Sequence, residues 1–594
     1  MATRLQRVGS DSWTMVVLAL LVGAGAGLGA IAFRYLIKGF TWLFTGHGEL
    51  GAHPHPSSPW LPGIGIACVV IAPVVGGLVY GPLVARFAPE ARGHGVPEVM
   101  LAIARKGGRI RPQVSIVKAL ASALCIGSGG SVGREGPIVQ IGSALGSTVA
   151  QMARLPERKL RLLVACGAAG GIAATFNAPI AGVFFALEVI LRDFQAESFG
   201  VVVLSSVTAA AVGRIAFGSA AFLRLPQFQL HSGGEYLLYA ALGVLGALVG
   251  LAFIRILYGT EDLADRLWRG PEWLRPAAGG VLLGLLLLAL PQMYGVGYPV
   301  LQAAVGGHYV IAFLVLLLVG KLVATSLTIA IGGSGGVFAP SLFMGAALGS
   351  CFGQGLHSLL PGIVTTPGAY GLVGMAAVFA AAARAPITAV IIIFELTGDY
   401  AIILPLMLAV VIAAGLSSAI TRNTIYTLKL RRRGIDLDAP KAGPLQALTV
   451  QAAMQPRIPA IVPTDLPVAA LAERLSDEAG QALPVVDEEG NLVGVVSPDD
   501  LEPALTEEAG ADTARQLARP VPDLRVADPL ERAARLLGES EEAGLPVLAA
   551  DSDSVVGWIT HRDVLRAYLG ERRTRPSTDR KAATAQTRRR APVT

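Results

Sequence analysis

The stretch Gly127-Ser-Gly-Gly-Ser-Val-Gly-Arg-Glu-Gly-Pro137 places one carboxylate, that of Glu135, in a glycine-rich segment between apolar runs. A carboxylate at membrane depth is costly and usually functional. The glycines let the backbone break and approach a ligand closely, and Pro137 suits the first residue of a new helix. Because a helix N-terminus attracts anions through its free N–H groups and its dipole, the stretch predicts an anion site. The protein's own glutamate can occupy that site, and this arrangement indicates anion transport.

The composition of the 594-residue chain is that of a polytopic membrane protein. Hydrophobic residues make up 53% of the chain and charged residues only 15%, with a mean hydropathy of +0.58. Soluble proteins carry about 25% charged residues. Apolar runs long enough to span a bilayer recur at Met15–Phe33, Ile64–Val84, Tyr236–Tyr258, Tyr309–Ile331 and Ala401–Ile420.

Shorter apolar pieces, interrupted by glycine and proline, lie between these runs. They are too short for an ordinary crossing, and broken helices persist in a membrane only where protein or a water-filled cavity satisfies their ends. Discontinuous helices around a central site are typical of transporters. The pieces are Val114–Ile126, Pro137–Ala150, Leu160–Ala174, Pro179–Leu191, Pro340–Phe352 and Pro386–Leu396.

The formal net charge of +6 is concentrated in particular loops. Lys and Arg gather at 105–111, 154–161 and 431–433, whereas Thr45–Trp60 and Pro291–His308 contain none. By the positive-inside rule we expect the basic loops and both termini in the cytoplasm. The compact, cysteine-poor loops suggest a prokaryotic plasma (inner) membrane. The basic clusters therefore indicate topology rather than nucleic-acid binding.

The membrane half is duplicated in sequence. Gly142-Ser-Ala-Leu-Gly-Ser147 follows Pro137, and Gly345-Ala-Ala-Leu-Gly-Ser350 follows Pro340 at the same distance. Glu188 lies nine residues after Pro179, and Glu395 lies nine residues after Pro386. The copies are offset by 203 residues at the first pair and 207 at the second. Internal repeats of this kind are typical of transporters, whose site lies at the repeat interface.

The two copies differ at the glutamate of the opening stretch. Val337 and Phe338 stand opposite Arg134 and Glu135, whereas the other glutamate is present in both copies. This asymmetry favours a chemical role for Glu135 over a structural one.

The polar C-terminal part contains a second repeat. Leu483-Pro-Val-Val-Asp487 leads to Leu492–Asp500, and Leu545-Pro-Val-Leu548 leads to Val555–Asp563. Apolar strands alternate there with amphipathic helices, which predicts two small α/β modules. The basic tail at 571–594 is predicted to be disordered.

Three motifs in the membrane part resemble those of the CLC family of chloride channels and chloride/proton exchangers. Gly133-Arg-Glu-Gly-Pro137 resembles the family's gating-glutamate motif, and Gly335-Gly-Val-Phe-Ala-Pro340 its second anion-site motif. Gly93-His-Gly-Val-Pro97 stands where the family usually has Gly-Ser-Gly-Ile-Pro. The resemblance implies an all-α polytopic membrane domain with inverted repeats and broken helices, forming a homodimer with one pore per subunit. The C-terminal repeats are similar to a cytoplasmic pair of α/β CBS domains.

The resemblance implies roles for individual residues. Glu135 would be the gate, whose carboxylate occupies the outer anion site until protonation or competing chloride releases it. Chloride would be held by the backbone amides of Val337 and Phe338 and by the Tyr426 hydroxyl, with Gly133 and His94 as further anion contacts. Amide and hydroxyl dipoles bind a halide weakly enough for it to leave again. For Val337, Phe338 and Tyr426 the competing interpretations are helix packing and an interfacial aromatic.

Two residues depart from the family pattern. His94 replaces a serine that helps to hold the central anion, so we expect it to tune anion choice or to make transport pH-dependent, unless it is turned away from the pore. Val189 replaces the inner glutamate that relays protons in many exchangers. The substitution favours a passive, channel-like chloride pathway. A chloride/proton antiporter with another proton route is the alternative.

The C-terminal modules suggest regulation by ATP, ADP or AMP, since CBS pairs often bind adenine nucleotides. The candidate contacts are Ser497 with Asp500 and Thr560 with Asp563, although both pairs also fit plain helix N-caps. A membrane-anchored nucleotide sensor with a vestigial pore is a further alternative. The sequence indicates no enzyme, no required cofactor and no metal site, because the four cysteines are scattered and no phosphate loop is present.

These observations predict three regions. A CLC-type transmembrane domain would occupy residues 1–433, and tandem CBS domains would occupy 434–570, with modules at about 446–507 and 515–570. The basic tail would follow at 571–594.

Overall fold

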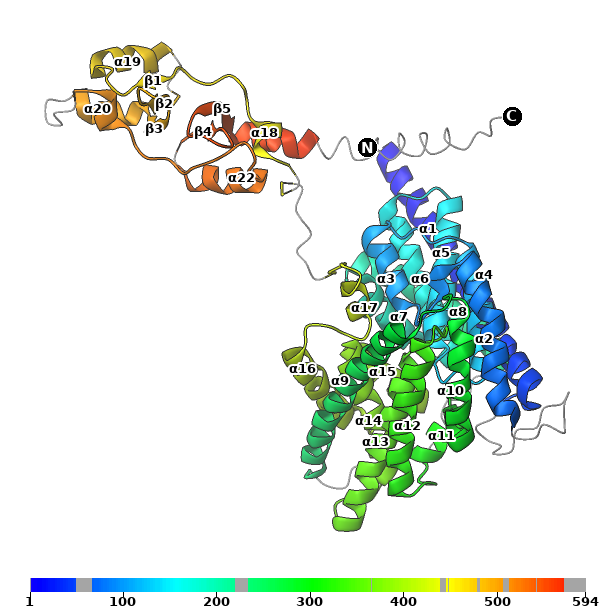
Figure 1. Ribbon diagram of the computed structural model, residues 1–594. Coiled ribbons are helices and arrows are strands. Elements are labelled where there is room, and N and C mark those ends of the chain that lie inside the picture. Colours follow the sequence, from blue (N-terminus) through cyan, green and yellow to red (C-terminus); the bar gives the residue numbers. More distant parts are fainter. Residues whose placement is uncertain are drawn as a thin grey trace, which may run out of the picture. The chain divides into compact units, whose positions relative to one another are not determined.

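The computed structural model describes residues 2–49, 67–218, 233–364, 366–437, 445–446, 448–477, 481–505, 512–540 and 542–570. The chain divides into two compact units, Met1–Leu437 and Asp438–Thr594 (Figure 1). The predicted 571–594 tail lies outside the described residues.

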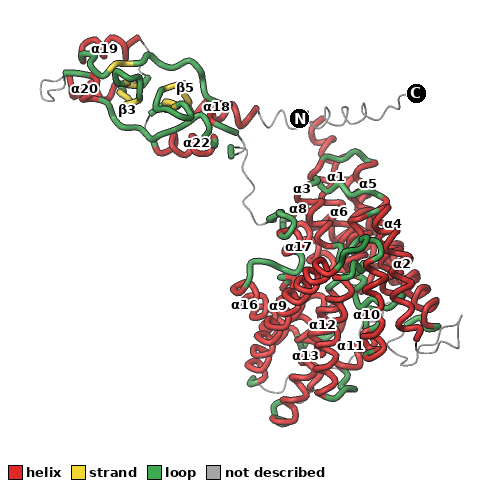
Figure 2. The backbone as a smooth tube through the Cα atoms, in the orientation of Figure 1, coloured by secondary structure: helices red, strands yellow, loops and turns green. Residues whose placement is uncertain are grey.

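The first unit is helical throughout its described part (Figure 2). Seven of its described helices are long and apolar enough to cross a membrane, and shorter apolar helices lie between them. The helices are α1 (Ala2–Thr45), α2 (Cys68–Phe87), α3 (Val96–Arg105), α4 (Gln113–Gly127), α5 (Glu135–Met152), α6 (Glu157–Phe176), α7 (Pro179–Phe185) with a π-helical turn at Ala186–Leu191, α8 (Ala196–Phe217), α9 (Glu235–Leu267), α10 (Arg275–Ala289), α11 (Tyr298–Val305), α12 (Ile311–Ala330), α13 (Phe338–Leu359), α14 (Pro367–Ala383), α15 (Pro386–Thr397), α16 (Ile403–Ile420) and α17 (Thr427–Arg431).

Several predicted helix bounds were wrong. The piece Leu160–Ala174, predicted to be too short to cross, belongs to the 20-residue α6, and α8 was not predicted as a span. Helix α5 begins at Glu135 and not at Pro137. The first-turn position of Pro137 is tolerated because the N–H groups of a first turn have no intrahelical acceptor.

The sequence duplication corresponds to a structural one. Helix α5 packs along α6, and α13 packs along α14. A Cβ on Gly142 would lie 2.1 Å from the Gly167 carbonyl oxygen, and a Cβ on Gly345 would lie 2.2 Å from the Gly374 carbonyl oxygen. Small residues therefore bring the helix backbones into close contact at the same place in both copies.

The structure adds a repeat that the sequence analysis did not predict. The loop Gly93-His-Gly-Val-Pro97 precedes α3, and Gly295-Val-Gly-Tyr-Pro299 precedes α11. Both glycines of each loop have positive φ, at 75° and 80° in the first loop and 63° and 88° in the second. Left-handed backbone favours glycine, so these loops have matching conformations.

A buried lysine holds each of these loops. Lys118 Nζ donates to the carbonyl oxygens of Ala91 at 2.8 Å and Gly93 at 2.7 Å. Lys321, 203 residues further on, donates to Ser131 Oγ at 2.9 Å and to the Gly295 and Val296 carbonyl oxygens at 3.1 Å. Both side chains are 0% exposed, and these hydrogen bonds compensate the cost of burying the ammonium groups.

The second unit contains two small sheets. Strands β1 (Val462–Pro463), β2 (Leu483–Val486) and β3 (Leu492–Val496) form one, and β4 (Gly544–Leu548) pairs antiparallel with β5 (Val555–Thr560) in the other. The helices are α18 (Val450–Ala453), α19 (Val468–Asp477), α20 (Pro498–Leu505), α21 (Ala514–Leu517) and α22 (Leu530–Glu539), and residues 561–570 are also helical. The unit is α/β, as predicted.

The start of this unit packs with the second module, although the predicted bounds assigned residues from about 446 to the first. The backbones of Gln455 and Trp558 exchange hydrogen bonds of 2.8 and 3.0 Å, and Val450 belongs to the same apolar core as Leu545 and Ile559. The first module has its own core, around Val485 and Leu471.

Candidate functional site

The two glycine-rich helix tips of the membrane unit are hydrogen-bonded to each other. Gly133 N–H donates to the Gly336 carbonyl oxygen at 2.7 Å, and Gly336 N–H donates to the Gly133 carbonyl oxygen at 2.6 Å. Helix α5 begins two residues after Gly133, and α13 begins two residues after Gly336. The repeat interface therefore brings two helix N-termini together, and both have positive dipole character.

The Glu135 carboxylate lies between these tips and is 1% exposed. Its Oε2 accepts a hydrogen bond from the backbone N–H of Ala339, in the first turn of α13, at 3.3 Å. Its Oε1 accepts a hydrogen bond from the Tyr298 hydroxyl. A carboxylate from one repeat thus occupies the N-terminus of a helix from the other.

Gly133 allows this close approach. A Cβ at this position would lie 2.1 Å from Glu135 Oε2 and 3.1 Å from the Ala339 Cβ. Any side chain at position 133 would displace the carboxylate or the start of α13.

The amides of Val337 and Phe338 remain available to a ligand. In the described part of the chain, neither N–H has a hydrogen-bond acceptor. The Phe338 ring is anchored separately, with its centroid 4.4 Å from that of Phe379 and 5.6 Å from that of Phe176. Packing of the ring is therefore compatible with a backbone N–H that has no acceptor within the described part of the chain.

Tyr426 is buried at 2% exposure, so it is not an interfacial aromatic facing lipid. Tyr426 occupies the N-cap position of the short α17, and its ring centroid lies 6.2 Å from that of His94.

His94 is buried beside Tyr426 and points one ring nitrogen at Tyr258. The Tyr258 hydroxyl donates to the Ile425 carbonyl oxygen at 2.6 Å, so the 3.3 Å contact with His94 Nε2 requires an N–H on that nitrogen. Nδ1 is buried without a partner. It is a bare acceptor in neutral imidazole, and it can donate to an anion only after His94 is protonated.

Val189 lies on the π-helical turn and is 5% exposed. The neighbouring Glu188 faces the second repeat, where it accepts hydrogen bonds from the backbone amides of Ile387 at 3.1 Å and Thr388 at 2.9 Å. Its carboxylate is therefore engaged in holding the start of α15.

The sequence model of the family described as voltage gated chloride channel matches residues 76–418. The chain belongs to the CLC family. The sequence resemblance is thereby confirmed.

Several CLC relatives are similar to most of the membrane unit. A ClcB-like protein of Ralstonia nicotianae is 34% identical over 426 residues, which is 71% of this chain and 98% of that protein. The H(+)/Cl(-) exchange transporter ClcA of Vibrio parahaemolyticus is 34% identical over 439 residues, covering 71% of this chain and 91% of the transporter.

Solved CLC structures have the same fold. A slow cyanobacterial Cl-/H+ antiporter superimposes with a TM-score of 0.64 at 26% identity, over 70% of this chain and 97% of the antiporter. A eukaryotic CLC transporter gives a TM-score of 0.60 at 22% identity, over 92% of this chain and 97% of the transporter. The predicted all-α membrane fold is confirmed.

The CBS domain model matches residues 450–507 and 514–570, which confirms the predicted pair. In the first module, Asp500 binds Ser497 and also Arg519, whose Nε lies 2.6 Å from Asp500 Oδ1. Arg519 also contacts Ser497 Oγ at 2.8 Å and Glu542 at 3.1 Å.

In the second module Asp563 is 2% exposed. Its Oδ2 accepts from the Thr560 hydroxyl at 2.6 Å, and Gln455 Nε2 lies 2.9 Å from Oδ1. Each predicted Ser/Thr and Asp pair is thus brought together, and each carboxylate binds further residues of the same unit.

Three contacts of the CLC site were missed in the sequence analysis: Tyr298, Ala339 and Lys321. The signal for Tyr298 was present, because Gly295–Pro299 repeats the spacing of glycine and proline in Gly93–Pro97. Ala339 follows directly after the two predicted amides. Lys321 also carried a signal, because it lies in the middle of the predicted span Tyr309–Ile331, where a charged side chain is costly and usually functional.

Proposed function

We propose that this CLC protein transports chloride and similar small anions through a pore in each subunit of a homodimer, with Glu135 as the gate. The proposal rests on one observation: the Glu135 carboxylate accepts a hydrogen bond of 3.3 Å from the backbone N–H of Ala339. A negative group already lies where the helix dipole attracts anions. An anion can pass only when the carboxylate leaves, on protonation or by competition.

The remaining contacts suit a weakly held halide. The Val337 and Phe338 amides and the Tyr426 hydroxyl offer partial positive charges without a full ion pair, and His94 lies beside Tyr426. Ions bound by dipoles alone leave readily, as conduction requires. We assign these groups and Gly133 to the anion path.

A passive, channel-like mode is favoured by position 189. Val189 is apolar and buried, and the adjacent Glu188 is engaged by the α15 amides. Neither side chain is then positioned to pass protons between the cytoplasm and Glu135.

Proton-coupled exchange is the second candidate. It is favoured by similarity to the ClcA exchange transporters and to the cyanobacterial antiporter. Glu135 would then carry the proton, which would enter by a route that avoids position 189.

One experiment separates the two modes. Purified protein in liposomes is loaded with chloride, and chloride efflux and external pH are recorded together for wild type and Glu135→Gln. Passive transport predicts efflux without proton movement, and an exchanger predicts proton movement at a fixed ratio to chloride. Absence of anion flux in wild type would refute the proposal, and flux with unchanged gating in the variant would remove Glu135 from it.

We further propose that the CBS pair lies in the cytoplasm and binds an adenine nucleotide, with both termini on the same side of a bacterial inner membrane. The contacts would be Ser497 with Asp500 and Thr560 with Asp563. A nucleotide at the first pair has to displace Arg519 from Asp500. The test is the thermal stability of the full-length protein with ATP, ADP or AMP, which remains constant if no nucleotide binds. A nucleotide-dependent shift in a protein without flux would favour the sensor alternative.

A further inference from the structure

A small cavity lies next to the gate, with Arg134 and Tyr298 in its wall. It is lined by the end of α1 and by residues 294–299, and it also includes Gly48 and Glu49. Residues 294–299, Gly48 and Glu49 belong to the two loops without Lys or Arg, which the positive-inside rule assigns to the extracellular side, and the end of α1 leads into the first of these loops. The cavity therefore faces the outer solution in the proposed topology.

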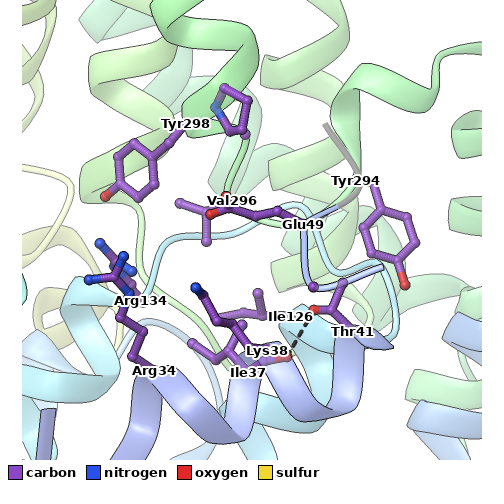
Figure 3. Close-up of a pocket in the computed structure, with 14 residues that line it drawn as sticks. Arg34, Ile37, Lys38, Thr41, Glu49, Ile126, Arg134, Tyr294, Val296 and Tyr298 are labelled. Carbon is purple, nitrogen blue, oxygen red and sulfur yellow. Dashed lines mark hydrogen bonds between the residues drawn. The ribbon is translucent and has the colours of Figure 1, made fainter. Parts of the chain in front are cut away.

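The cavity wall is rich in positive charge. Its lining contains the basic side chains of Arg34, Lys38 and Arg134 and one acidic side chain, that of Glu49. Figure 3 shows the Arg34 and Arg134 guanidinium groups close together below the Tyr298 hydroxyl, with the Lys38 ammonium directed into the space between the walls. The Arg34 and Arg134 charges repel each other. An anion between them would relieve that repulsion.

Both guanidinium groups lie over aromatic rings, and Arg134 also donates to the Thr175 carbonyl oxygen at 3.5 Å. Arg34 lies over the Phe217 ring at 4.2 Å, and Arg134 lies over the Tyr298 ring at 5.1 Å. Stacking uses the flat faces of a guanidinium group. Its N–H groups lie in the plane and can still donate to acceptors at the edge.

Tyr298 connects the cavity to the gate. The residue lines the cavity, and its hydroxyl donates to Glu135 Oε1. A tyrosine hydroxyl has a single proton to donate. It can therefore hold the Glu135 carboxylate or an anion in the cavity, but not both.

The loop that contains Tyr298 is the counterpart of the inner anion loop. Gly93–Pro97 places His94 beside Tyr426, and Gly295–Pro299 places Tyr298 beside Glu135. The Lys321 ammonium donates to a carbonyl oxygen of the second loop, just as the Lys118 ammonium donates to one of the first loop. The repeat thus provides one loop of the same geometry at each end of the anion path.

We propose that this cavity is an external anion-loading site for a small monovalent anion such as chloride, held by Arg34, Lys38 and Arg134. Its occupant competes with the Glu135 carboxylate for the Tyr298 hydroxyl, so that loading an anion releases the gate. The site rests on the proposed anion transport and adds a binding step before the gate.

The first test measures the initial rate of chloride influx into right-side-out membrane vesicles at increasing external chloride. For Arg34→Gln/Lys38→Gln we expect the half-saturating external chloride to rise several-fold, because the loading charges are lost. Arg105→Gln/Lys106→Gln, which removes the same charge from the predicted cytoplasmic side, should leave the external half-saturation unchanged. Lys38→Gln alone changes an exposed side chain, so it serves if the double variant does not fold, with a smaller rise expected.

The second test measures the coupling between the cavity and the gate. Tyr298→Phe should increase the influx rate at low external chloride in the wild-type background and change it little in Glu135→Gln. Tyr309→Phe, an aromatic control without a described bond to the gate, should have no effect. Equal effects of Tyr298→Phe in both backgrounds would overturn the competition.

The two proposals fail in different ways. Wild-type vesicles without anion influx contradict the proposed function itself. Wild-type influx with the same external half-saturation in Arg34→Gln/Lys38→Gln and in Lys38→Gln contradicts the loading site alone.

Discussion

Glu188 and Glu395 each hold the beginning of a helix in the opposite repeat. Glu188 accepts hydrogen bonds from the amides of Ile387 and Thr388 in the first turn of α15. Glu395 accepts hydrogen bonds of 3.0 and 2.7 Å from the amides of Ile180 and Ala181 in the first turn of α7. The pair therefore satisfies helix N-terminal donors inside the membrane unit, where water is scarce.

This reciprocity predicts similar effects of the two matched substitutions, although Glu188 also accepts a hydrogen bond of 2.7 Å from the Thr388 hydroxyl. Glu188→Gln and Glu395→Gln each replace a charged acceptor of two amides by a neutral one, at a cost of ~1–3 kcal/mol in stability. We expect both variants to have a lower Tm in detergent by a similar amount, with the anion selectivity of wild type. A proton-transport defect in Glu188→Gln at wild-type Tm would instead place this residue on a proton path.

Gly133→Ala tests whether the Glu135 carboxylate lies against Gly133 and the first turn of α13. The new Cβ would lie 2.1 Å from Glu135 Oε2, so we expect the carboxylate to be displaced and chloride efflux to depend less on pH. In a Glu135→Ala background the clash is absent, and the same substitution should add little. Gly415→Ala is the control, because a Cβ there meets nothing within 4 Å. An unchanged pH profile of chloride efflux in Gly133→Ala would argue against this position of the Glu135 carboxylate.

His94→Ser tests whether the imidazole contributes to anion binding at low pH. Tyr258 and Tyr426 face His94 within the site. Burial opposes its protonation first, followed by the positive charges of Lys429, Lys118 and Arg433, so the imidazole gains a proton only at acidic pH. Nδ1 becomes a donor only when the proton is gained. We therefore expect anion affinity to rise on acidification in wild type and to remain flat in His94→Ser.

The measurement is made in the Glu135→Gln background, which removes the titration of the gate itself. Anion affinity is obtained from chloride titrations of the purified protein at several pH values. Superimposable profiles for the two proteins would show that His94 does not bind the anion.

Arg519→Ala tests access to the first CBS pair. The substitution releases Asp500 from its ion pair, so adenine nucleotide should raise the Tm of the full-length protein more than in wild type. Asp500→Asn is expected to abolish that gain. Arg515→Ala, an exposed arginine on α21, is the matched control. A smaller nucleotide response in Arg519→Ala would mean that this arginine contributes to the nucleotide site.

Local sequence patterns were sufficient for much of the candidate site. Three of these patterns involve residues close together in the sequence. They are the glycines around Glu135, the spacing of Pro179 and Glu188 that recurs at Pro386 and Glu395, and the alternation of apolar strands with amphipathic helices in the C-terminal part. They indicated the broken helices, the duplication and the two α/β modules. Helix bounds were less predictable, because proline is compatible with the whole first turn and apolar runs do not mark where α6 ends.

Such patterns mark the loop that contains Tyr298 and the motif that contains Ala339, but not the contacts that these residues make with Glu135. Tyr298 lies 163 residues from Glu135 in the sequence, and Ala339 lies 204 residues away. The repeat offset of 203 residues relates equivalent positions of the two copies, but it does not tell which of their atoms meet, because that contact arises only when the two repeats pack together. The position of His94 beside Tyr426 has the same origin.

The sequence by itself determined which residues can form helices, where these break and which glutamate lacks a partner in the second repeat, because these properties depend on neighbouring residues. The tertiary structure decided what the broken ends contact. The N-termini of two helices come together at one carboxylate only because the backbones of Gly133 and Gly336 exchange hydrogen bonds between the repeats.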